Sequence, residues 1–416
     1  MHRRTFLAST LALAGTARAQ NLPAPALVRP PEQRWNIAVP VLDFAAPDTG
    51  KPCAPALQAA LDAAFEAGLP LVFPRGEWII EKPLAIRHVE RRRRGCPHIL
   101  GAGSGSTILR ALPFAGPMLG VRGVPEAPPL GHFFLSGGGV EGIDFVGSGT
   151  RAPGQNGIET MGWWQGTLKN CGFYTLGGHG IRSAGDLSLD PNPDWTSSIL
   201  RVEGCNFARL GGWGFLDDNP IGSPAWVFSH CVFNMCVGGG AFTRSSGHEY
   251  LGCSFGACGF VDEQTAGPGF GTGLRIGDPP GSAINRTRVI VAEFDSSKDA
   301  HVLVDRASSF LLEDCRFIHN DRFGTGTAVP PVAVQLGTDA ARSQATGGRI
   351  IRALFRLDTP GPVTGFRCAS VNRIRDVVIE PALWSVEYQG DSWLTKFEGF
   401  PEGEAAKRAR VVIEEG

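Results

Sequence analysis

The chain has 416 residues, with 39 Lys and Arg against 40 Asp and Glu and a formal net charge of −1. This balance does not favour a general nucleic-acid-binding protein, which would carry a clear basic excess. The 56 Gly and 31 Pro occur in a chain that is still 43% hydrophobic, which favours many short strands and tight turns over helices.

Residues 1–19 have the layout of a cleaved bacterial export signal. Arg3-Arg4 precedes an apolar run, Phe6–Ala14, and Ala17-Arg18-Ala19 supplies the small-residue cleavage pattern. The arginine pair favours the twin-arginine type, with an ordinary secretion signal as the alternative. No later stretch approaches the roughly 20 apolar residues of a membrane span. We therefore expect a periplasmic or extracellular protein, with residues 20–37 as a linker.

A single amphipathic helix is predicted near the start of the folded part. Its apolar face combines Leu57, Ala60, Leu61, Ala64 and Phe65, with Pro55 near the beginning and Gly68 just after the end. A strand, Leu71–Phe73, follows at once. A short helix ahead of many strands is expected to cap the open end of a stacked core.

Phenylalanines mark an irregular internal repeat. The shortest spacing, 22 residues, suits one coil of three short strands and three turns. Stacking such coils buries the inward faces of their strands against the coils above and below. The repeat positions are Phe145, Phe173, Phe207, Phe233, Phe255, Phe294, Phe317 and Phe355.

Two further features recur with these phenylalanines. A residue eight positions later begins a second short strand, and in three coils it directly follows a glycine: Gly180, Gly214 and Gly240. Five cysteines lie two residues before a repeat Phe and should form an inward column of mostly free thiols, with one or two disulfides still possible. These cysteines are Cys171, Cys205, Cys231, Cys253 and Cys315.

The opening of the domain resembles a known superfamily. Leu42–Gly50 (LDFAAPDTG), the helix, Val72–Trp78 (VFPRGEW) and Ile99–Leu109 (ILGAGSGSTIL) are similar to the start of pectate-lyase-like proteins. The resemblance covers roughly residues 38–380. It implies an all-β, single-stranded, right-handed parallel β-helix with a short N-terminal capping α-helix. Residues 381–416 lose the repeat, and we interpret them as a C-terminal cap or tail.

The superfamily includes pectate lyases, polygalacturonases, rhamnogalacturonases, epimerases and phage tailspikes. Gly178-His179-Gly180 matches one of the polygalacturonase motifs. Where the resemblance calls for paired aspartates, however, this chain has Gln155-Asn156-Gly157, and its acidic pair, Asp217-Asp218, comes after the histidine. The sequence therefore does not favour a polygalacturonase mechanism.

Two columns of residues are expected on one exposed sheet face. One contains Asn156, His179 and Trp213, and the next contains Glu159, Arg182 and Arg275. Aromatic rings pack on sugar faces, and arginine pairs with uronate carboxylates. We predict a saccharide groove here, with these substrate-binding residues: Asn156, Trp213, Asp218, Arg244 and His248.

β-Elimination from a uronate needs a cation at the carboxylate and a base for the neighbouring ring proton. The prediction assigns the cations to Arg182 and Arg275 and the base to His179, whose ordinary pKa suits that task. Glu159 completes the catalytic set. No carboxylate cluster of the kind that binds calcium is seen on these coils, so we expect neither a metal nor another cofactor.

The sequence thus predicts an exported lyase that acts on an acidic polysaccharide or oligosaccharide, with no nucleic acid and no membrane span. Three alternatives stay open. A non-catalytic binding or structural β-helix would keep the groove and lack a base. A glycoside hydrolase could pair Glu159 with Asp217 or Asp218. A C5-epimerase begins with the same proton abstraction as a lyase. We expect a monomer, although a trimer would fit the tailspike relatives.

Overall fold

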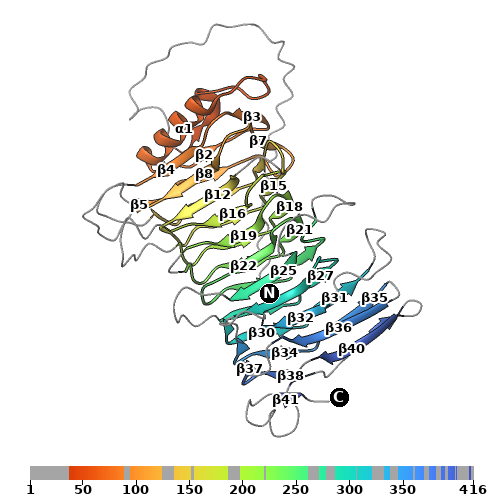
Figure 1. Cartoon of the computed structure of the whole chain (residues 1–416). Helices are drawn as coiled ribbons and strands as arrows, with labels where there is room; N and C mark the ends of the chain where they lie inside the picture. The colour runs from red at the N-terminus through yellow and green to blue at the C-terminus, as the bar shows by residue number, and fades with distance from the viewer. Residues whose placement is uncertain are drawn as a thin grey trace, which may run out of the picture. The chain divides into compact units, whose positions relative to one another are not determined.

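The structure is a computed structural model of the whole chain (Figure 1). The chain divides into residues 1–36 and Ile37–Gly416, and only the second part contains described residues. The prediction for residues 1–36, an export signal followed by most of the linker, lies outside them. The described residues are 37–88, 94–123, 135–150, 154–185, 197–219, 222–260, 271–277, 286–305, 307–320, 332–337, 345–358, 361–369, 374–380, 386–388, 392–398, 400 and 412–413.

Stacked coils of parallel strands form the fold, and each coil contributes one strand to each of three long sheets. The predicted parallel β-helix is therefore confirmed. The first sheet, sheet A, contains β1 (Val39–Pro40), β2 (Leu71–Val72), β6 (His98–Leu100), β10 (Gly139–Glu141), β14 (Thr167–Lys169), β17 (Arg201–Glu203), β20 (Val227–Ser229), β23 (Glu249–Leu251), β26 (Thr287–Ile290), β30 (Phe310–Glu313), β34 (Arg349–Ile351), β38 (Val378–Glu380) and β41 (Val412–Ile413).

The second sheet, sheet B, contains β3 (Gly76–Ile80), β7 (Thr107–Ala111), β11 (Asp144–Val146), β15 (Gly172–Tyr174), β18 (Asn206–Leu210), β21 (Val232–Cys236), β24 (Ser254–Gly256), β27 (Glu293–Asp295), β31 (Arg316–His319), β35 (Leu354–Leu357) and β39 (Val386–Tyr388). The third sheet, sheet C, contains β4 (Leu84–Arg87), β8 (Gly116–Arg122), β12 (Gln155–Met161), β16 (Ile181–Ser183), β19 (Trp213–Asp217), β22 (Gly239–Thr243), β25 (Thr272–Gly277), β28 (Ala300–Asp305), β32 (Val332–Leu336), β36 (Gly361–Cys368) and β40 (Ser392–Glu398).

Short elements complete the set: the 3-10 helix η2 (Val41–Asp43) and two three-stranded sheets. The first of these sheets joins β5 (Arg94–Gly95), β9 (Leu135–Ser136) and β13 (Trp163–Trp164). The second joins β29 (Ala307–Ser308), β33 (Ala345–Thr346) and β37 (Ile374–Arg375).

Strands of the stacked sheets also occur beyond residue 380, in the region interpreted above as a C-terminal cap or tail. β39 pairs with β35 in sheet B, β40 pairs with β36 in sheet C, and β41 pairs with β38 in sheet A. Val386 stands opposite Phe355, at the place where earlier coils have Phe. The sequence repeat does not show this pairing because the residue opposite Phe355 is a valine and not a phenylalanine.

The helix α1 (Ala54–Ala67) caps the first coil, as predicted. Its buried face is the expected set, and Gly68 ends it in the left-handed conformation with φ 65°. The side-chain amide of Gln58 donates to the carbonyl of Ala85 at 2.8 Å and accepts from its N–H at 2.9 Å. Gln58 thus satisfies backbone groups of β4, the edge strand of sheet C, as a neighbouring strand would.

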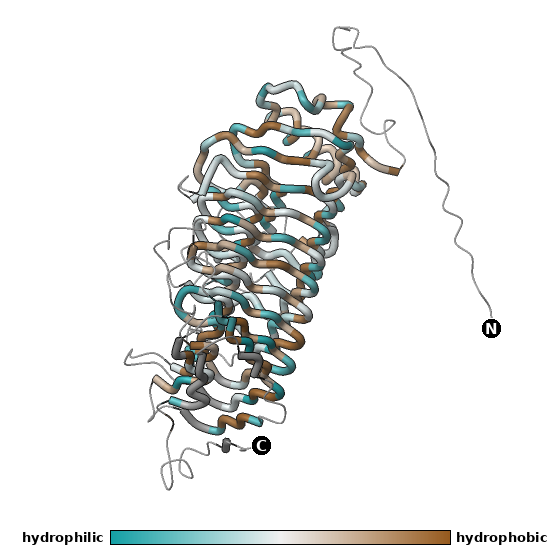
Figure 2. The backbone as a smooth tube through the Cα atoms, turned by 90° about the vertical axis from the view of Figure 1, so that its right-hand side faces the viewer, coloured by the Kyte–Doolittle hydropathy of each residue, from teal (hydrophilic) through white to brown (hydrophobic). Residues whose placement is uncertain are grey.

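The eight repeat phenylalanines form one continuous stack through the core, strand by strand in register. The rings of Phe207 and Phe233, for example, lie 4.7 Å apart and 3° from parallel. Hydrophobic and hydrophilic positions alternate along the stacked coils around this core (Figure 2). The aromatic repeat therefore reports the interior of the fold.

A column of glycines makes room for that stack. A Cβ at Gly214 would lie 2.4 Å from the ring of Phe233, and a Cβ at Gly240 would lie 2.5 Å from the ring of Phe255. Both positions also face the backbone carbonyl of the glycine in the next coil, 2.4–2.6 Å away. The glycines that precede the second strand are thus required by close packing.

All ten cysteines are free thiols, so the prediction of mostly free cysteines is confirmed and no disulfide forms. Nine are buried, and only Cys53 is partly exposed. Thiols of the predicted column donate to carbonyl oxygens two residues earlier, as from Cys171 to Lys169 at 3.3 Å. No helix among the described residues is long and apolar enough to cross a membrane.

Candidate functional site

Three side chains on successive coils of sheet C form a chain of contacts. The backbone N–H of His179 donates to Oδ1 of Asn156 at 2.9 Å. The backbone N–H of Trp213 donates to Nδ1 of His179, also at 2.9 Å. Each polar side chain therefore fixes the backbone of the following coil.

Burial determines the charge of the His179 ring, and the hydrogen bond from Trp213 determines its tautomer. Burial and, to a lesser extent, the positive charge of Arg182 together lower the pKa of His179 to about 4, while Asp218 opposes the shift. The ring is therefore neutral near pH 7. Since Nδ1 accepts a hydrogen bond, the ring hydrogen lies on Nε2. Nε2 makes no hydrogen bond within the described residues and is not among their buried unpaired atoms, so it faces solvent.

Glycines provide the space for these side chains. A Cβ at Gly178 would lie 2.3 Å from Oδ1 of Asn156, and one at Gly212 would lie 2.5 Å from Nδ1 of His179. A Cβ at Gly239 would lie 2.2 Å from the indole of Trp213. The glycine before His179 thus accommodates the side chain of the preceding coil, which accounts for part of the GGHG pattern.

Beside this column lies a row of ion pairs, which we name the ion-pair row: Arg122, Glu159, Arg182, Asp218 and Arg244. Glu159 accepts from Arg122 at 3.0 Å and from Arg182 at 3.1 Å. Arg182 also donates to Asp218 from Nε at 3.0 Å and from Nη2 at 2.5 Å. Arg244 approaches the other oxygen of Asp218 at 3.8 Å. One guanidinium therefore bridges two carboxylates.

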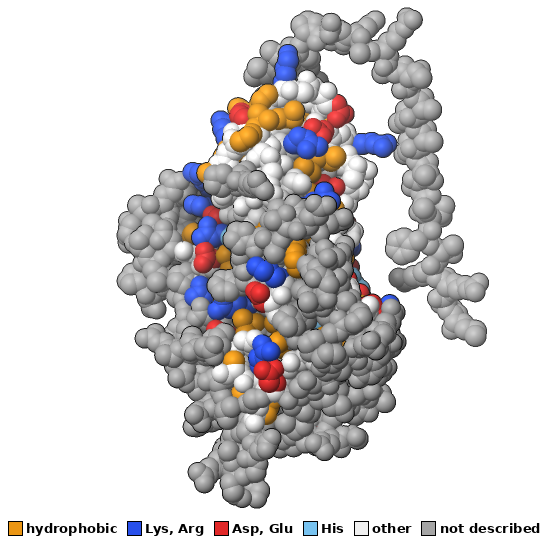
Figure 3. All heavy atoms as spheres, turned by 45° about the vertical axis from the view of Figure 1, so that its right-hand side comes forward, with side chains coloured by type: hydrophobic (Ala, Val, Ile, Leu, Met, Phe, Trp, Pro, Cys, Tyr) orange, Lys and Arg blue, Asp and Glu red, His pale blue; other side chains and the backbone are white. Residues whose placement is uncertain are grey.

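The ion-pair row carries three cations and two anions, a net charge of +1. Glu159 is almost buried, whereas 36% of the Asp218 side chain is exposed. Burial opposes the charge of Arg182, but its carboxylate partners, Asp218 first, raise its pKa above the ordinary value. Figure 3 shows basic and acidic side chains next to one another on the face that it draws.

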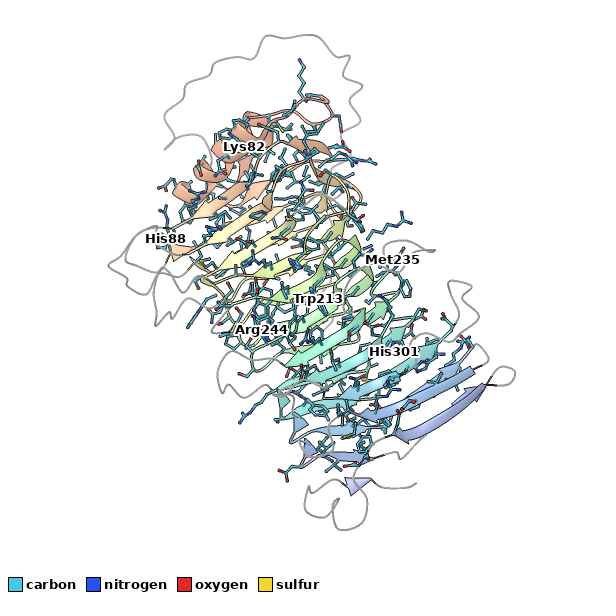
Figure 4. All side chains as sticks on the ribbon, viewed as in Figure 1. Lys82, His88, Trp213, Met235, Arg244 and His301 are labelled. Carbon is cyan, nitrogen blue, oxygen red and sulfur yellow. The ribbon has the colours of Figure 1, made fainter. Side chains whose placement is uncertain are left out.

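Aromatic side chains continue the face past the ion-pair row. The rings of Trp213 and Phe242 lie 5.4 Å apart. The guanidinium of Arg275 lies 4.6 Å from the centre of the Phe242 ring, and Arg275 pairs with Asp305 at 3.3 Å. Figure 4 shows Trp213 on sheet C, Arg244 just after the end of β22, and His301 on a later coil. Trp213 is only 7% exposed, so it lies almost entirely beneath the surface.

A buried polar network lies beneath this surface. Oγ of Ser245 donates to Asp217 at 2.5 Å, accepts the N–H of Ser223 at 2.8 Å and lies 2.9 Å from Nε2 of His248. The N–H of Arg244 also donates to Asp217, at 3.2 Å. Asp217 and His248 are fully buried. The network holds the chain at the two points where Asp218 and Arg244 emerge.

The structure brings together four of the nine predicted site residues, Glu159, Arg182, Asp218 and Arg244, in the ion-pair row. His179 and Trp213 lie in the adjacent column, as expected. Arg275 is outside the row and pairs with Asp305.

Two of the predicted substrate-binding residues lie beneath the face, not on it. Asn156 is 4% exposed and holds the backbone of His179, and His248 is 0% exposed and lies against Ser245. A polymer on the surface would reach neither side chain.

Arg122 was not predicted. It ends β8, where Met161 of the next coil stands opposite it, and its strand carries no phenylalanine marker. Its offset from Glu159 in the strand register gave no sign that the two side chains pair. Among the described residues there is no group of three or more His, Cys, Asp or Glu side chains that could hold a metal ion.

No protein-family model matches the chain, and no curated protein matches it in sequence. Solved structures do match it in fold. The mannuronan C-5 epimerase AlgE4 A-module of Azotobacter vinelandii has a TM-score of 0.56 at 14% identity, over 91% of this chain and 97% of that one. A mutant tailspike protein of E. coli bacteriophage HK620, in complex with a pentasaccharide, has a TM-score of 0.60 at 13% identity, over 90% and 64%.

The surface adhesin PfbA of Streptococcus pneumoniae has a TM-score of 0.54 at 12% identity, over 82% of this chain and 83% of the adhesin. These likenesses define the fold: the chain is a right-handed parallel β-helix. The neighbours include an epimerase, a saccharide-bound tailspike and an adhesin. Identities of this size do not transfer the activity of any one of them.

Proposed function

We propose that the chain is an exported lyase that binds an acidic polysaccharide across sheet C and cleaves it by β-elimination. The observation that carries the proposal is the ion-pair row, where three guanidinium groups and two carboxylates meet beside His179 on one face. This arrangement combines groups that can bind a uronate carboxylate with groups that can exchange protons.

The carboxylate of the sugar would bind at the arginines. Arg182 uses three of its five N–H groups on Glu159 and Asp218, and the others make no hydrogen bond within the described residues. Arg244 and Arg122 border the same place, with side chains 23% and 46% exposed. Positive charge here stabilises the negative charge that develops when the neighbouring ring proton leaves.

The remaining groups supply proton transfer. In β-elimination a base removes the proton next to the carboxylate, a carbon–carbon double bond forms, and the bond to the leaving glycosidic oxygen breaks. We assign the base to Asp218, the more exposed carboxylate of the ion-pair row. The neutral ring of His179 would donate a hydrogen bond from Nε2–H to the leaving oxygen, and the proton that this oxygen finally takes up would come from the protonated Asp218. A base role for His179 stays a prediction, and it would require the other tautomer and loss of the Trp213 hydrogen bond.

A glycoside hydrolase is the second candidate, favoured by one specific contact. Glu159 and Asp218 bind the same guanidinium, so the two carboxylates lie close together. Asp217, the other partner considered for Glu159, is buried beneath them.

The test uses the mature protein on a panel of acidic polysaccharides, with and without chelator. A rise in ultraviolet absorbance from unsaturated uronates, insensitive to chelator, is expected. New reducing ends without that absorbance would show that the protein is a glycoside hydrolase and not a lyase. Solvent hydrogen entering the sugar without cleavage would indicate a C5-epimerase. Retained binding with none of these changes would leave a binding protein.

Variants separate the two assignments for the base. Asp218→Asn should reduce turnover at least about 100-fold, because general-base catalysis contributes that much or more. His179→Ala should reduce it less, since the donor only assists the leaving oxygen. The reverse order would return the base to His179.

A further inference from the structure

A groove of about 610 Å³ lies between the capping helix α1 and β4, the first strand of sheet C. We name it the cap groove. Its volume is within the range of small-ligand sites. The residues used below line it on the helix side, Pro55, Ala59 and Asp62, and on the strand side, Lys82, Ala85 and Arg87.

The cap groove continues the face that carries the ion-pair row. Ala85 of β4 stands opposite Gly120 of β8, and Gly120 stands opposite Glu159 of β12. Arg87 stands opposite Arg122, which itself pairs with Glu159. Strands in a sheet are about 4.7–4.9 Å apart, so the groove lies two strand steps, roughly 10 Å, from Glu159.

Charge along this path suits an anionic chain. Lys82 is exposed and makes no ion pair or hydrogen bond within the described residues. Arg87 is also exposed, and together with the carboxylate of Asp62, which accepts from Gln58 at 2.8 Å, the three charged side chains of the lining carry a net charge of +1. Figure 3 shows hydrophobic side chains grouped with basic and acidic ones near the top of the molecule, the end where Figure 1 labels α1. An apolar floor with cations at its margin matches the face and the carboxylate of a uronate.

We propose that the cap groove is a remote subsite that binds an anionic sugar unit of the same polysaccharide chain. The inference rests on the proposed function. It adds the path of the bound polymer, which runs from the ion-pair row toward α1. Binding energy gained here would favour long substrates over short ones.

The test measures the dissociation constant of the intact protein for uronate oligosaccharides of increasing length. Affinity of the wild type should increase once an oligomer is long enough to reach from the ion-pair row to the cap groove. Lys82→Glu should remove roughly threefold to tenfold of that gain and leave short oligomers unaffected. Lys51→Glu is the matched control, because it reverses the same charge near the cap but outside the lining of the groove.

Three results would overturn the subsite. Equal length dependence in the wild type and Lys82→Glu would show that the groove contacts no sugar. An equal loss of affinity in Lys51→Glu would show that the effect comes from the overall charge near the cap and not from a contact with Lys82. No length dependence in the wild type, while short oligomers still bind, would leave the proposed function intact and the groove without a sugar. If no oligomer bound or reacted at all, the proposed function itself would fail.

Discussion

Nδ1 of His179 accepts the backbone N–H of Trp213, 34 residues later, at 2.9 Å. The side chain that most resembles a catalyst in the sequence therefore also joins two coils of sheet C. Its bound nitrogen is fixed by the fold, and its other nitrogen faces solvent. The two roles can be separated by substitution, because one depends on an acceptor and the other on a donor.

His179→Ala should lower the free energy of unfolding by about 1–2 kcal/mol, because the Trp213 N–H loses its acceptor in a mostly buried place. His179→Gln offers a side-chain oxygen at a similar distance from the backbone and should cost less. Denaturant unfolding of the three proteins measures the difference. Equal losses in the two variants would mean that ring packing over Gly212, not the hydrogen bond, is the main contribution.

The lowered pKa of His179 predicts a specific dependence on pH. Between the folded value of about 4 and the ordinary value of 6.5, the unfolded chain binds more protons than the folded chain. The contribution of this residue is therefore fully present above pH 6.5 and is lost as the pH falls through that range toward 4. Allowing for partial exposure of the ring, the loss is on the order of 2 kcal/mol.

His179→Gln cannot take up this proton, so it isolates the effect from other groups. The stability difference between the wild type and His179→Gln should shrink as the pH falls from 7 to 4. Unfolding curves at several pH values measure it. A constant difference over this range would contradict a buried neutral imidazole.

The glycine column predicts large effects from the smallest of substitutions. A Cβ at Gly214 would lie 2.4 Å from the Phe233 ring and 2.6 Å from the carbonyl of Gly240. Because the backbone cannot move without shifting the next coil, Gly214→Ala should destabilise by about 2–3 kcal/mol. Gly120→Ala on the same sheet is the control, since its Cβ would meet nothing closer than 3.8 Å and should cost little. Thermal unfolding of both compares them, and similar melting temperatures would refute the packing argument.

The sequence could predict the fold because the fold repeats. Phe173 and Phe207 occupy equivalent positions on successive coils, and the glycines before Ile181 and Phe215 recur for the same steric reason. A requirement met many times leaves a visible pattern even at irregular spacing. Two consecutive residues of a strand also have different surroundings, because successive side chains point to opposite faces of a sheet. Asp218, one position after the buried Asp217, accordingly lies at the surface.

The details of the site could be predicted only in part. That His248 is buried against Ser245 depends on the turn after β22, and no repeat constrains that turn. Arg122 pairs with Glu159 because its long side chain reaches across strands from an offset position. The tautomer of His179 is set by a backbone group on another coil. Each of these is a single contact between distant segments, which leaves no periodic mark in the sequence.

The cysteines allow a chemical test of the interior. Burial raises the pKa of Cys258 and of Cys315 to about 12, so these thiols are protonated and shielded at neutral pH. In the native protein a thiol reagent should label about one cysteine, Cys53, while unfolding should expose all ten. Reductant should leave the melting temperature unchanged. A decrease on reduction would reveal a disulfide and contradict the free column.

The buried network beneath the ion-pair row should position Asp218 and Arg244. Ser245→Ala removes the hydroxyl that binds Asp217 at 2.5 Å and is expected to lower the free energy of unfolding by about 1–3 kcal/mol. Turnover on the acidic oligosaccharide should fall as well, because both neighbouring charged residues lose a fixed backbone. Thr107→Val is the matched control, because the Thr107 hydroxyl is also buried and donates to the carbonyl of Pro74 at 3.0 Å but lies on sheet B, outside this network. If both variants lose equal stability but only Ser245→Ala loses turnover, the network positions Asp218 and Arg244. Equal turnover in the two variants would mean that the network contributes to stability alone.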